Sequence, residues 1–210
     1  MKTPSSRRPL RLGLLGGTFD PIHNGHLALA HAALRRLRLD AVLFVPCGRP
    51  PHKDRPGLSP YLHRYTMVTL ACAGEPRLIP SLLEAGPGLR GGHRIYSVQT
   101  VSRLRRALGP QAQIHFLLGA DAFLYLHQWK SVRRLLRLCR FAVAGRPGFD
   151  WRRARILRDV VSFSYLPRVK VGVSASVIRR RAARRGSLAA LVPPAVADYI
   201  AKLELYRKGR

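Results

Sequence analysis

The sequence is short of acidic residues. Only ten Asp and Glu stand against 38 Lys and Arg in 210 residues, giving a formal net charge of +28. Such a charge attracts phosphate-bearing partners, whether nucleotides or nucleic acid. Compositional bias is the alternative interpretation, because most of these residues are arginines scattered along helical segments rather than gathered in one tail. Two of the few acids, Asp20 and Asp121, lie inside glycine-marked turns.

Cysteines and long apolar runs are also scarce. The three cysteines, Cys47, Cys72 and Cys139, have neither disulfide nor metal-ligand spacing, so we expect reduced thiols, two or three of them buried. No run of about 18 apolar residues occurs, which excludes a helical membrane span. The apolar stretch Leu12–Leu15 is too short for a signal peptide, so we expect a cytoplasmic protein.

Short apolar segments alternate with helical ones along the chain. The predicted strands are 11–15, 41–47, 77–81, 114–118, 140–144 and 169–173. The predicted helices are 26–37, 61–73, 97–108, 176–185 and 194–205, with one helix or two over 123–138. Wholly apolar strands that alternate with helices imply a parallel sheet covered on both faces.

This pattern predicts a single α/β domain over residues 1–210. We expect a Rossmann-like, doubly wound parallel sheet with helices on both faces. Residues 1–10 are expected to form a flexible basic N-terminus, and 191–207 a C-terminal helix packed on the domain.

Turn-forming segments follow the carboxyl ends of the predicted strands. They are GGTFD at 16–20, GRPPHK at 48–53, GAD at 119–121, GRPG at 145–148 and VSAS at 173–176. In parallel sheets of this kind, ligands bind beyond the carboxyl ends of the strands. The convergence of five segments predicts a binding site at this edge.

The first of these segments extends into GGTFDPIHNGHL at 16–27. Its glycines let the backbone approach a ligand closely, and the following helix start offers unpaired N–H groups to an anion. Neither a Walker P-loop nor GxGxxG is present. His23 and His26 can point the same way and stabilise charge on an attacked phosphoryl group. The alternatives are a metal pair, for which no third ligand stands nearby, or two helix-capping histidines.

The last segment extends into VSASVIRRR at 173–181. Ser174 and Ser176 are N-cap types just before a helical run, and their hydroxyls can hold phosphate. Arg179 lies one turn into the helix, where its guanidinium can reach a triphosphate. The alternative is a capping motif followed by a solvated basic helix, which we favour for Arg180, Arg181, Arg184 and Arg185.

Together, GGTFDPIHNGHL and VSASVIR resemble the paired motifs of the HxGH nucleotidyltransferase superfamily. Within it, the chain resembles the bacterial nicotinate-nucleotide adenylyltransferases nearly end to end. The shared segments include PPHK at 50–53, IYSVQT at 95–100, FLLGAD at 116–121, the tryptophan of LHQWK, GRPG at 145–148 and LVPPAVADYI at 191–200. The chain departs from the family where Gln99 replaces a common acid and Ser176 a threonine.

The resemblance implies transfer of AMP from ATP to nicotinate mononucleotide by direct in-line attack, without a covalent enzyme intermediate. It implies catalytic roles for His23, His26, Ser176 and Arg179. The implied ATP-binding residues are Gly16, Gly17, Thr18, Phe19, His23, His26, Gly119, Asp121, Arg146, Ser174, Ser176, Ile178 and Arg179. The implied mononucleotide-binding residues are Lys53, Tyr96, Ser97 and Trp129. Mg²⁺ would arrive on ATP, with no protein side chains as ligands.

Within this resemblance, the Tyr96 and Ser97 amides would bind the nicotinate carboxylate, and Trp129 would stack on the pyridine ring. Two other interpretations stay open. One is a different acceptor, such as nicotinamide mononucleotide. The other is a nucleic-acid-binding protein that uses the net charge, although no RNA-binding motif with paired aromatics is visible.

Overall fold

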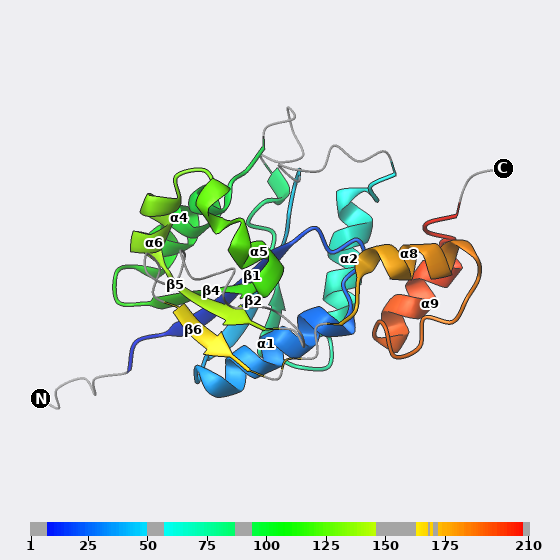
Figure 1. Cartoon of the computed structure of the whole chain (residues 1–210), viewed down its shortest axis with the longest axis horizontal. Coiled ribbons are helices and arrows are strands. Elements are labelled where there is room, and N and C mark those ends of the chain that lie inside the picture. Colours follow the sequence, from blue (N-terminus) through cyan, green and yellow to red (C-terminus); the bar gives the residue numbers. More distant parts are fainter. Residues whose placement is uncertain are drawn as a thin grey trace, which may run out of the picture.

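A six-stranded, all-parallel sheet forms the centre of the molecule (Figure 1). The computed structural model describes residues 8–49, 57–86, 94–145, 163–167, 169 and 172–207. The strands are β1 (Arg11–Gly17), β2 (Ala41–Pro46), β3 (Leu78–Pro80), β4 (Gln113–Gly119), β5 (Arg140–Ala144) and β6 (Phe163–Leu166). Their order is β3-β2-β1-β4-β5-β6, and every neighbouring pair is parallel. The predicted Rossmann-like, doubly wound sheet is therefore confirmed.

Helices cover both faces of this sheet. One face packs against α1 (Asn24–Arg36), α2 (Tyr61–Cys72), α8 (Ala175–Ala183) and α9 (Pro194–Lys202). The other packs against α4 (Ser97–Leu108), α5 (Ala120–Leu124), a 3₁₀ turn (Leu126–Gln128) and α6 (Val132–Leu138). Adjacent residues of β1 point to opposite faces, so Leu14 joins the second core and Leu15 the first.

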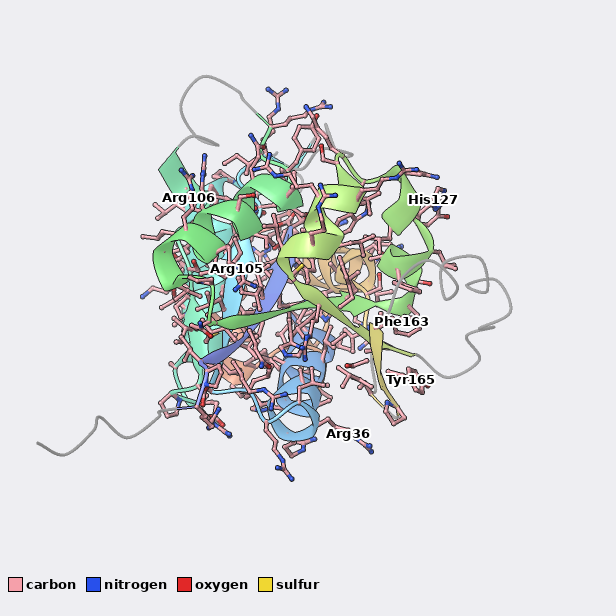
Figure 2. The ribbon with its side chains drawn as sticks, turned by 90° about the vertical axis from the view of Figure 1, so that its left-hand side faces the viewer. Arg36, Arg105, Arg106, His127, Phe163 and Tyr165 are labelled. Carbon is pink, nitrogen blue, oxygen red and sulfur yellow. The ribbon has the colours of Figure 1, made fainter. Side chains whose placement is uncertain are left out.

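Helices of the two layers lie at opposite ends of the molecule. Helices α4 and α6 lie on the left of Figure 1, whereas α8 and α9 lie beyond α2 at the far right. Figure 2 looks onto the α4 and α6 side, with the edge strand β6 and its Phe163 and Tyr165 below them. The chain returns from the edge strand β3 to β4, which pairs with β1 at the middle of the sheet; strand order reverses there, and doubly wound proteins bind ligands at such a point.

The predicted strand at 169–173 is wrong. Among the described residues the last strand is β6 (Phe163–Leu166), and Val169, Gly172 and Val173 are not in a strand, while positions 170 and 171 lie outside the described residues. The segment FSYL lies at the sheet edge and buries only Leu166 fully, so it lacks the continuous apolar run of a central strand. The valines of 169–173 mimic such a run, but Val169 is buried outside the ladder.

The remaining predicted elements occur with small shifts of their bounds. Residues 123–138 divide into the end of α5, the 3₁₀ turn and α6, and Ser131 before α6 has a left-handed φ of 54°. None of the three cysteines forms a disulfide, and Cys72 and Cys139 are buried, as predicted. Residues 1–7 lie outside the described residues. Among the helices that the structure describes, none combines the length and apolarity needed to cross a membrane.

A buried histidine in β4 predicts acid sensitivity. His115 is 2% exposed, and neither ring nitrogen has a hydrogen-bond partner in the described part of the chain. Burial, and then the charges of Arg11 and Arg140, lower its pKa to about 4. The unfolded chain therefore takes up this proton first as pH falls below 6.5. Its contribution to stability is complete at neutral pH and is lost as pH falls from 6.5 towards 4.

We expect His115→Leu to flatten this pH dependence. Between pH 7 and pH 5, protonation of His115 alone should lower the free energy of unfolding of the wild type by about 2 kcal/mol. The variant lacks this group, so its free energy of unfolding should not fall by this amount. Urea melts at the two pH values measure the difference. His127→Leu is the control, because this exposed ring is solvated in both states (Figure 2). An equal loss in wild type and His115→Leu would contradict the assignment.

Candidate active site

Two adjoining cavities lie at the carboxyl edge of the sheet. The histidine cavity, of about 420 Å³, is lined by Thr18, Phe19, Asp20, Pro21, His23, His26, Ser174, Ala175, Ser176 and Arg179. The tryptophan cavity, of about 350 Å³, is lined by Gly16, Gly17, Thr18, Val45, Cys47, Glu84, Ile95, Tyr96, Ser97, Phe116, Gln128, Trp129 and Lys130. Thr18 lines both cavities. A ligand in one cavity would therefore lie next to a ligand in the other.

The two imidazoles of the histidine cavity stack on each other at the start of α1. Their ring centroids are 3.7 Å apart with an interplanar angle of 22°. Burial lowers the pKa of His23 to about 4, and burial together with the His23 charge lowers the pKa of His26 well below its usual value. Both rings are therefore neutral at pH 7.

One hydrogen bond sets the tautomer of His26. The His23 N–H donates to His26 Nδ1 at 3.2 Å, so the proton of the neutral His26 ring resides on Nε2. This nitrogen is then a hydrogen-bond donor available to a ligand. Helix capping and ligand binding, which the sequence presents as alternatives, are compatible here because each uses a different ring nitrogen.

The N-cap and first turns of α8 also line the histidine cavity. Ser174 is the N-cap of α8, and its Oγ lies 2.7 Å from Ser176 Oγ. Arg179 Nη1 donates to the Asp20 carbonyl oxygen at 2.6 Å, which ties α8 to the loop after β1. The predicted residues Ser174, Ser176 and Arg179 are thus brought beside His23 and His26.

The two glycines at the end of β1 have different surroundings. A Cβ on Gly17 would lie 3.0 Å from the Phe19 ring, so a larger residue here would need the ring to shift by a few tenths of an ångström. A Cβ on Gly16 would make only ordinary contacts, with Phe116 at 3.8 Å and Leu14 at 4.0 Å, so its absence leaves room for a ligand in the tryptophan cavity. Phe19 is 2% exposed and supports the His26 ring edge-on at 5.0 Å.

Aromatic contacts orient the groups of the tryptophan cavity. Trp129 packs edge-on against Phe116 with ring centroids 5.6 Å apart. Lys130 Nζ lies 4.5 Å from the Tyr96 ring centroid. The predicted residues Tyr96, Ser97 and Trp129 therefore line one cavity, with an ammonium group beside them.

Gln99 supplies the helix cap where the family commonly has an acid. Its Oε1 accepts a hydrogen bond from the Tyr96 N–H at 2.9 Å. The Tyr96 amide, predicted to bind a ligand, is therefore already engaged. The next amide, that of Ser97, has no hydrogen-bond partner among the described residues and lies at the positive end of α4.

Glu84, which the sequence analysis missed, joins two walls of the tryptophan cavity. Thr100 Oγ1 donates to Glu84 Oε1 at 2.6 Å, and the Gly48 N–H donates to Oε2 at 3.2 Å. Burial raises the pKa of this carboxyl group, and these hydrogen bonds oppose the shift. Glu84 thereby connects α4 to the loop after β2. Its signal in the sequence was its isolation, as the only acid between Glu75 and Asp121.

Arg64 was also missed, and it organises the loops above the sheet. This side chain is 1% exposed on α2. It donates to the carbonyl oxygens of Thr18, Cys47, Gly48 and Ser59 at 2.8–3.2 Å. The loops after β1 and β2 are therefore clamped together. A single charged residue within the apolar helix YLHRYTMVTLAC was the available signal.

The other predicted site residues lie outside these two cavities or outside the described chain. Gly119 ends β4, and Asp121 is exposed in the first turn of α5. Ile178 is fully buried in the core, so only its main chain can meet a ligand. Lys53 and Arg146 lie outside the described residues.

The side chains that line the histidine cavity do not form a metal-binding set within the described residues. No cluster of three or more His, Cys, Asp or Glu suited to a metal occurs within the residues that the structure describes. The one carboxylate of the cavity, Asp20, accepts a hydrogen bond from Tyr206. The neutral imidazoles, hydroxyls and guanidinium here suit phosphate oxygens better than a hard cation.

Comparisons with known proteins agree with this geometry. The cytidylyltransferase-like family model matches residues 14–181. A protein of Moorella thermoacetica named "Probable nicotinate-nucleotide adenylyltransferase" is 41% identical, over 95% of this chain and 93% of its own. One of the same name from Thermoanaerobacter sp. (strain X514) is 37% identical over 96% of each chain.

Solved structures show the same fold. The Plasmodium falciparum nicotinic acid mononucleotide adenylyltransferase complexed with NaAD has a TM-score of 0.78 at 19% sequence identity, covering 94% of this chain and 97% of its own. The solved structures show the shared fold, and the sequence matches over nearly the whole chain show the family. The chain belongs to the nicotinate-nucleotide adenylyltransferase family, within the cytidylyltransferase-like proteins.

Proposed function

We propose that the protein transfers the AMP moiety of ATP to nicotinate mononucleotide, releasing pyrophosphate and nicotinate adenine dinucleotide. The observation that carries this proposal is the pair of cavities that meet at Thr18. One presents donors suited to phosphates, and the other presents aromatic rings and a helix start. A phosphate acceptor and a triphosphate donor bound in them would meet at the shared wall.

ATP is assigned to the histidine cavity. His26 Nε2–H, the hydroxyls of Ser174 and Ser176, and the Arg179 guanidinium all donate hydrogen bonds, and no free carboxylate competes for them. Because the imidazoles are neutral, His26 acts as a fixed dipole rather than an acid. Gly119, Asp121 and Arg146, together with the Ile178 main chain, are assigned to the nucleoside side.

The chemistry needs no protein nucleophile. A phosphate oxygen of the mononucleotide attacks the α-phosphorus of ATP in line, and the bond from that phosphorus to the bridging oxygen of pyrophosphate breaks. Negative charge grows on the non-bridging and leaving oxygens. Donors placed beforehand by His23, His26, Ser176 and Arg179 stabilise it, so positioning and charge stabilisation account for catalysis.

Magnesium fits this site as a companion of the nucleotide. The histidine cavity offers few oxygen ligands, so Mg²⁺ would be held mainly by phosphate oxygens and water. When bound, it neutralises part of the triphosphate charge. The protein groups would then orient the phosphates around it.

Nicotinate mononucleotide is assigned to the tryptophan cavity. Trp129 is placed to stack on the pyridine ring, and Lys53 to meet the phosphate. The Ser97 amide at the start of α4, with Lys130 nearby, suits a carboxylate more than a neutral amide. The Tyr96 amide can join only if Gln99 releases it.

We therefore expect a preference for nicotinate over nicotinamide mononucleotide. A charge-assisted hydrogen bond is worth about 1.5–3 kcal/mol, so kcat/KM should favour the nicotinate form by at least about tenfold. Pyrophosphate release with Mg-ATP and each acceptor measures the ratio. An equal or reversed preference would contradict nicotinate mononucleotide as the acceptor, but would not contradict adenylyl transfer itself.

Asp121→Ala is expected to raise the KM for ATP by about tenfold or more, and that for the mononucleotide little. The exposed carboxylate follows β4, where it can accept hydrogen bonds from ribose hydroxyls, each worth about 1.5–3 kcal/mol. Steady-state kinetics with each substrate varied in turn measures both constants. Asp198→Ala, at an exposed acid on α9, is the control. An unchanged ATP KM in folded Asp121→Ala would exclude the role.

A further inference from the structure

A buried cation holds the turn that lies between the two cavities. Arg64 is 1% exposed, and its guanidinium donates to four main-chain carbonyl oxygens. The two shortest of these hydrogen bonds, both 2.8 Å, end at the oxygens of Thr18 and Cys47. An apolar side chain would fill this interior position without the cost of burying a charge. What the guanidinium adds is therefore a fixed orientation of the peptide units that it holds.

The hydrogen bond to Thr18 sets the direction of the next amide. A trans peptide unit is planar, so its C=O and N–H point in opposite directions, and the Thr18–Phe19 bond is trans. The Thr18 carbonyl points at Arg64, and the Phe19 N–H therefore points away from it. Thr18 and Phe19 line the histidine cavity, whereas Arg64 lines neither cavity. The Phe19 N–H has no hydrogen-bond partner among the described residues, which leaves it as a donor on the cavity side.

Phe19 has a strained backbone at this point. Its φ is 50°, in the left-handed region that bulky side chains rarely adopt and whose cost the surrounding contacts must offset. The ring packs against Phe44 and His26, with centroids 5.8 Å and 5.0 Å away, and Arg64 holds the preceding carbonyl oxygen. Strained residues of this kind gather at ligand-binding sites, where the strain helps to aim a group.

We infer that Arg64 is a positioning residue for adenylyl transfer: by holding the Thr18 carbonyl oxygen, it aims the Phe19 N–H at phosphates bound in the histidine cavity. The inference rests on the proposed function for the identity of the ligand. Because Thr18 lines both cavities, this amide lies near the shared wall, where the α-phosphoryl group would be attacked. A donor that is fixed there beforehand stabilises the growing charge without having to reorient.

The kinetic test compares Arg64→Lys with a matched control, Arg105→Lys. Arg105 on α4 (Figure 2) lines neither cavity but also donates to main-chain carbonyl oxygens, those of Gly109, Pro110, Ala112 and Leu138. Lysine keeps the charge but lacks the fork that reaches several oxygens at once. We expect Arg64→Lys to lower kcat/KM for ATP by at least about tenfold, and Arg105→Lys to leave it unchanged. Thermal melts report the stability that each variant loses, and wild-type kinetics in folded Arg64→Lys would overturn the inference.

Amide-proton NMR of the wild type tests the inference without any variant. When Mg-ATP is added, the Phe19 N–H signal should move downfield, because a hydrogen bond to a phosphate oxygen deshields the proton. The side-chain N–H protons of Arg64 should exchange slowly with water in the same complex, because carbonyl oxygens hold them. An unmoved Phe19 signal in the ATP complex, or rapid exchange of the Arg64 protons, would overturn the inference.

Calorimetric titration with Mg-ATP alone separates this inference from the proposed function. Weaker ATP binding by Arg64→Lys than by Arg105→Lys supports the inference even if the wild type forms no dinucleotide. Equal ATP binding by the two folded variants overturns it even if the wild type does form the dinucleotide. A wild type that binds no Mg-ATP would overturn both.

Discussion

Alanine in place of His26 is expected to lower kcat by about 10²–10³, the usual cost of removing one preorganised donor to developing charge. The His23 N–H holds His26 Nδ1, which leaves Nε2–H to meet the transferring phosphoryl group. Steady-state kinetics at saturating substrates measures the loss. If His26 served only as a helix cap, its removal would instead cost about 1 kcal/mol of stability and leave turnover nearly normal.

His31→Ala is the matched control for this change. His31 lies on the same helix and outside the histidine cavity, so its loss should leave kcat unchanged. Thermal melts of both variants separate a folding defect from a catalytic one. Normal kcat in a folded His26→Ala protein would remove this residue from the catalytic set.

Arg179→Ala is expected to lower kcat by a similar factor, about 10²–10³. Its guanidinium is anchored on the Asp20 carbonyl oxygen at the edge of the histidine cavity, where the charge of the departing pyrophosphate would develop. Arg179→Lys should recover only part of the loss, because an ammonium group keeps the charge but not the planar fork that binds phosphate in two places.

Arg180→Ala supplies the comparison for Arg179. The neighbouring arginine is exposed and does not line the cavity, so its loss should change neither kcat nor stability. Equal activities of Arg179→Ala and Arg180→Ala would mean that Arg179 is a surface cation without a role in turnover.

Residues that follow strands or begin helices were predictable from the sequence. His23, His26 and Ser176 are polar side chains at helix starts next to strand ends, and the parallel sheet brings such places to one edge. The position of these residues next to a strand end in the sequence is therefore enough to place them at the carboxyl edge of the sheet. The same logic failed for β6, because an edge strand that buries little carries no clear apolar signal.

Residues that act across long sequence separations were not predictable. Arg64 contacts the carbonyl oxygens of Thr18 and Cys47 from a helix interior, and Tyr206 reaches Asp20 from near the C-terminus. A charged or phenolic side chain in these segments is compatible with a solvated surface as well as with a buried contact. Only the packing of α2 and of the segment after α9 against the loop after β1 distinguishes the two.

Product analysis with purified wild-type protein tests the proposed adenylyl transfer most directly. The protein is incubated with Mg-ATP and nicotinate mononucleotide, and the nucleotides and pyrophosphate are separated and quantified. We predict that nicotinate adenine dinucleotide and pyrophosphate form in equal amounts, and that ATP stays intact without the acceptor. Failure to form the dinucleotide, or release of pyrophosphate in the absence of nicotinate mononucleotide, would contradict the proposed transfer.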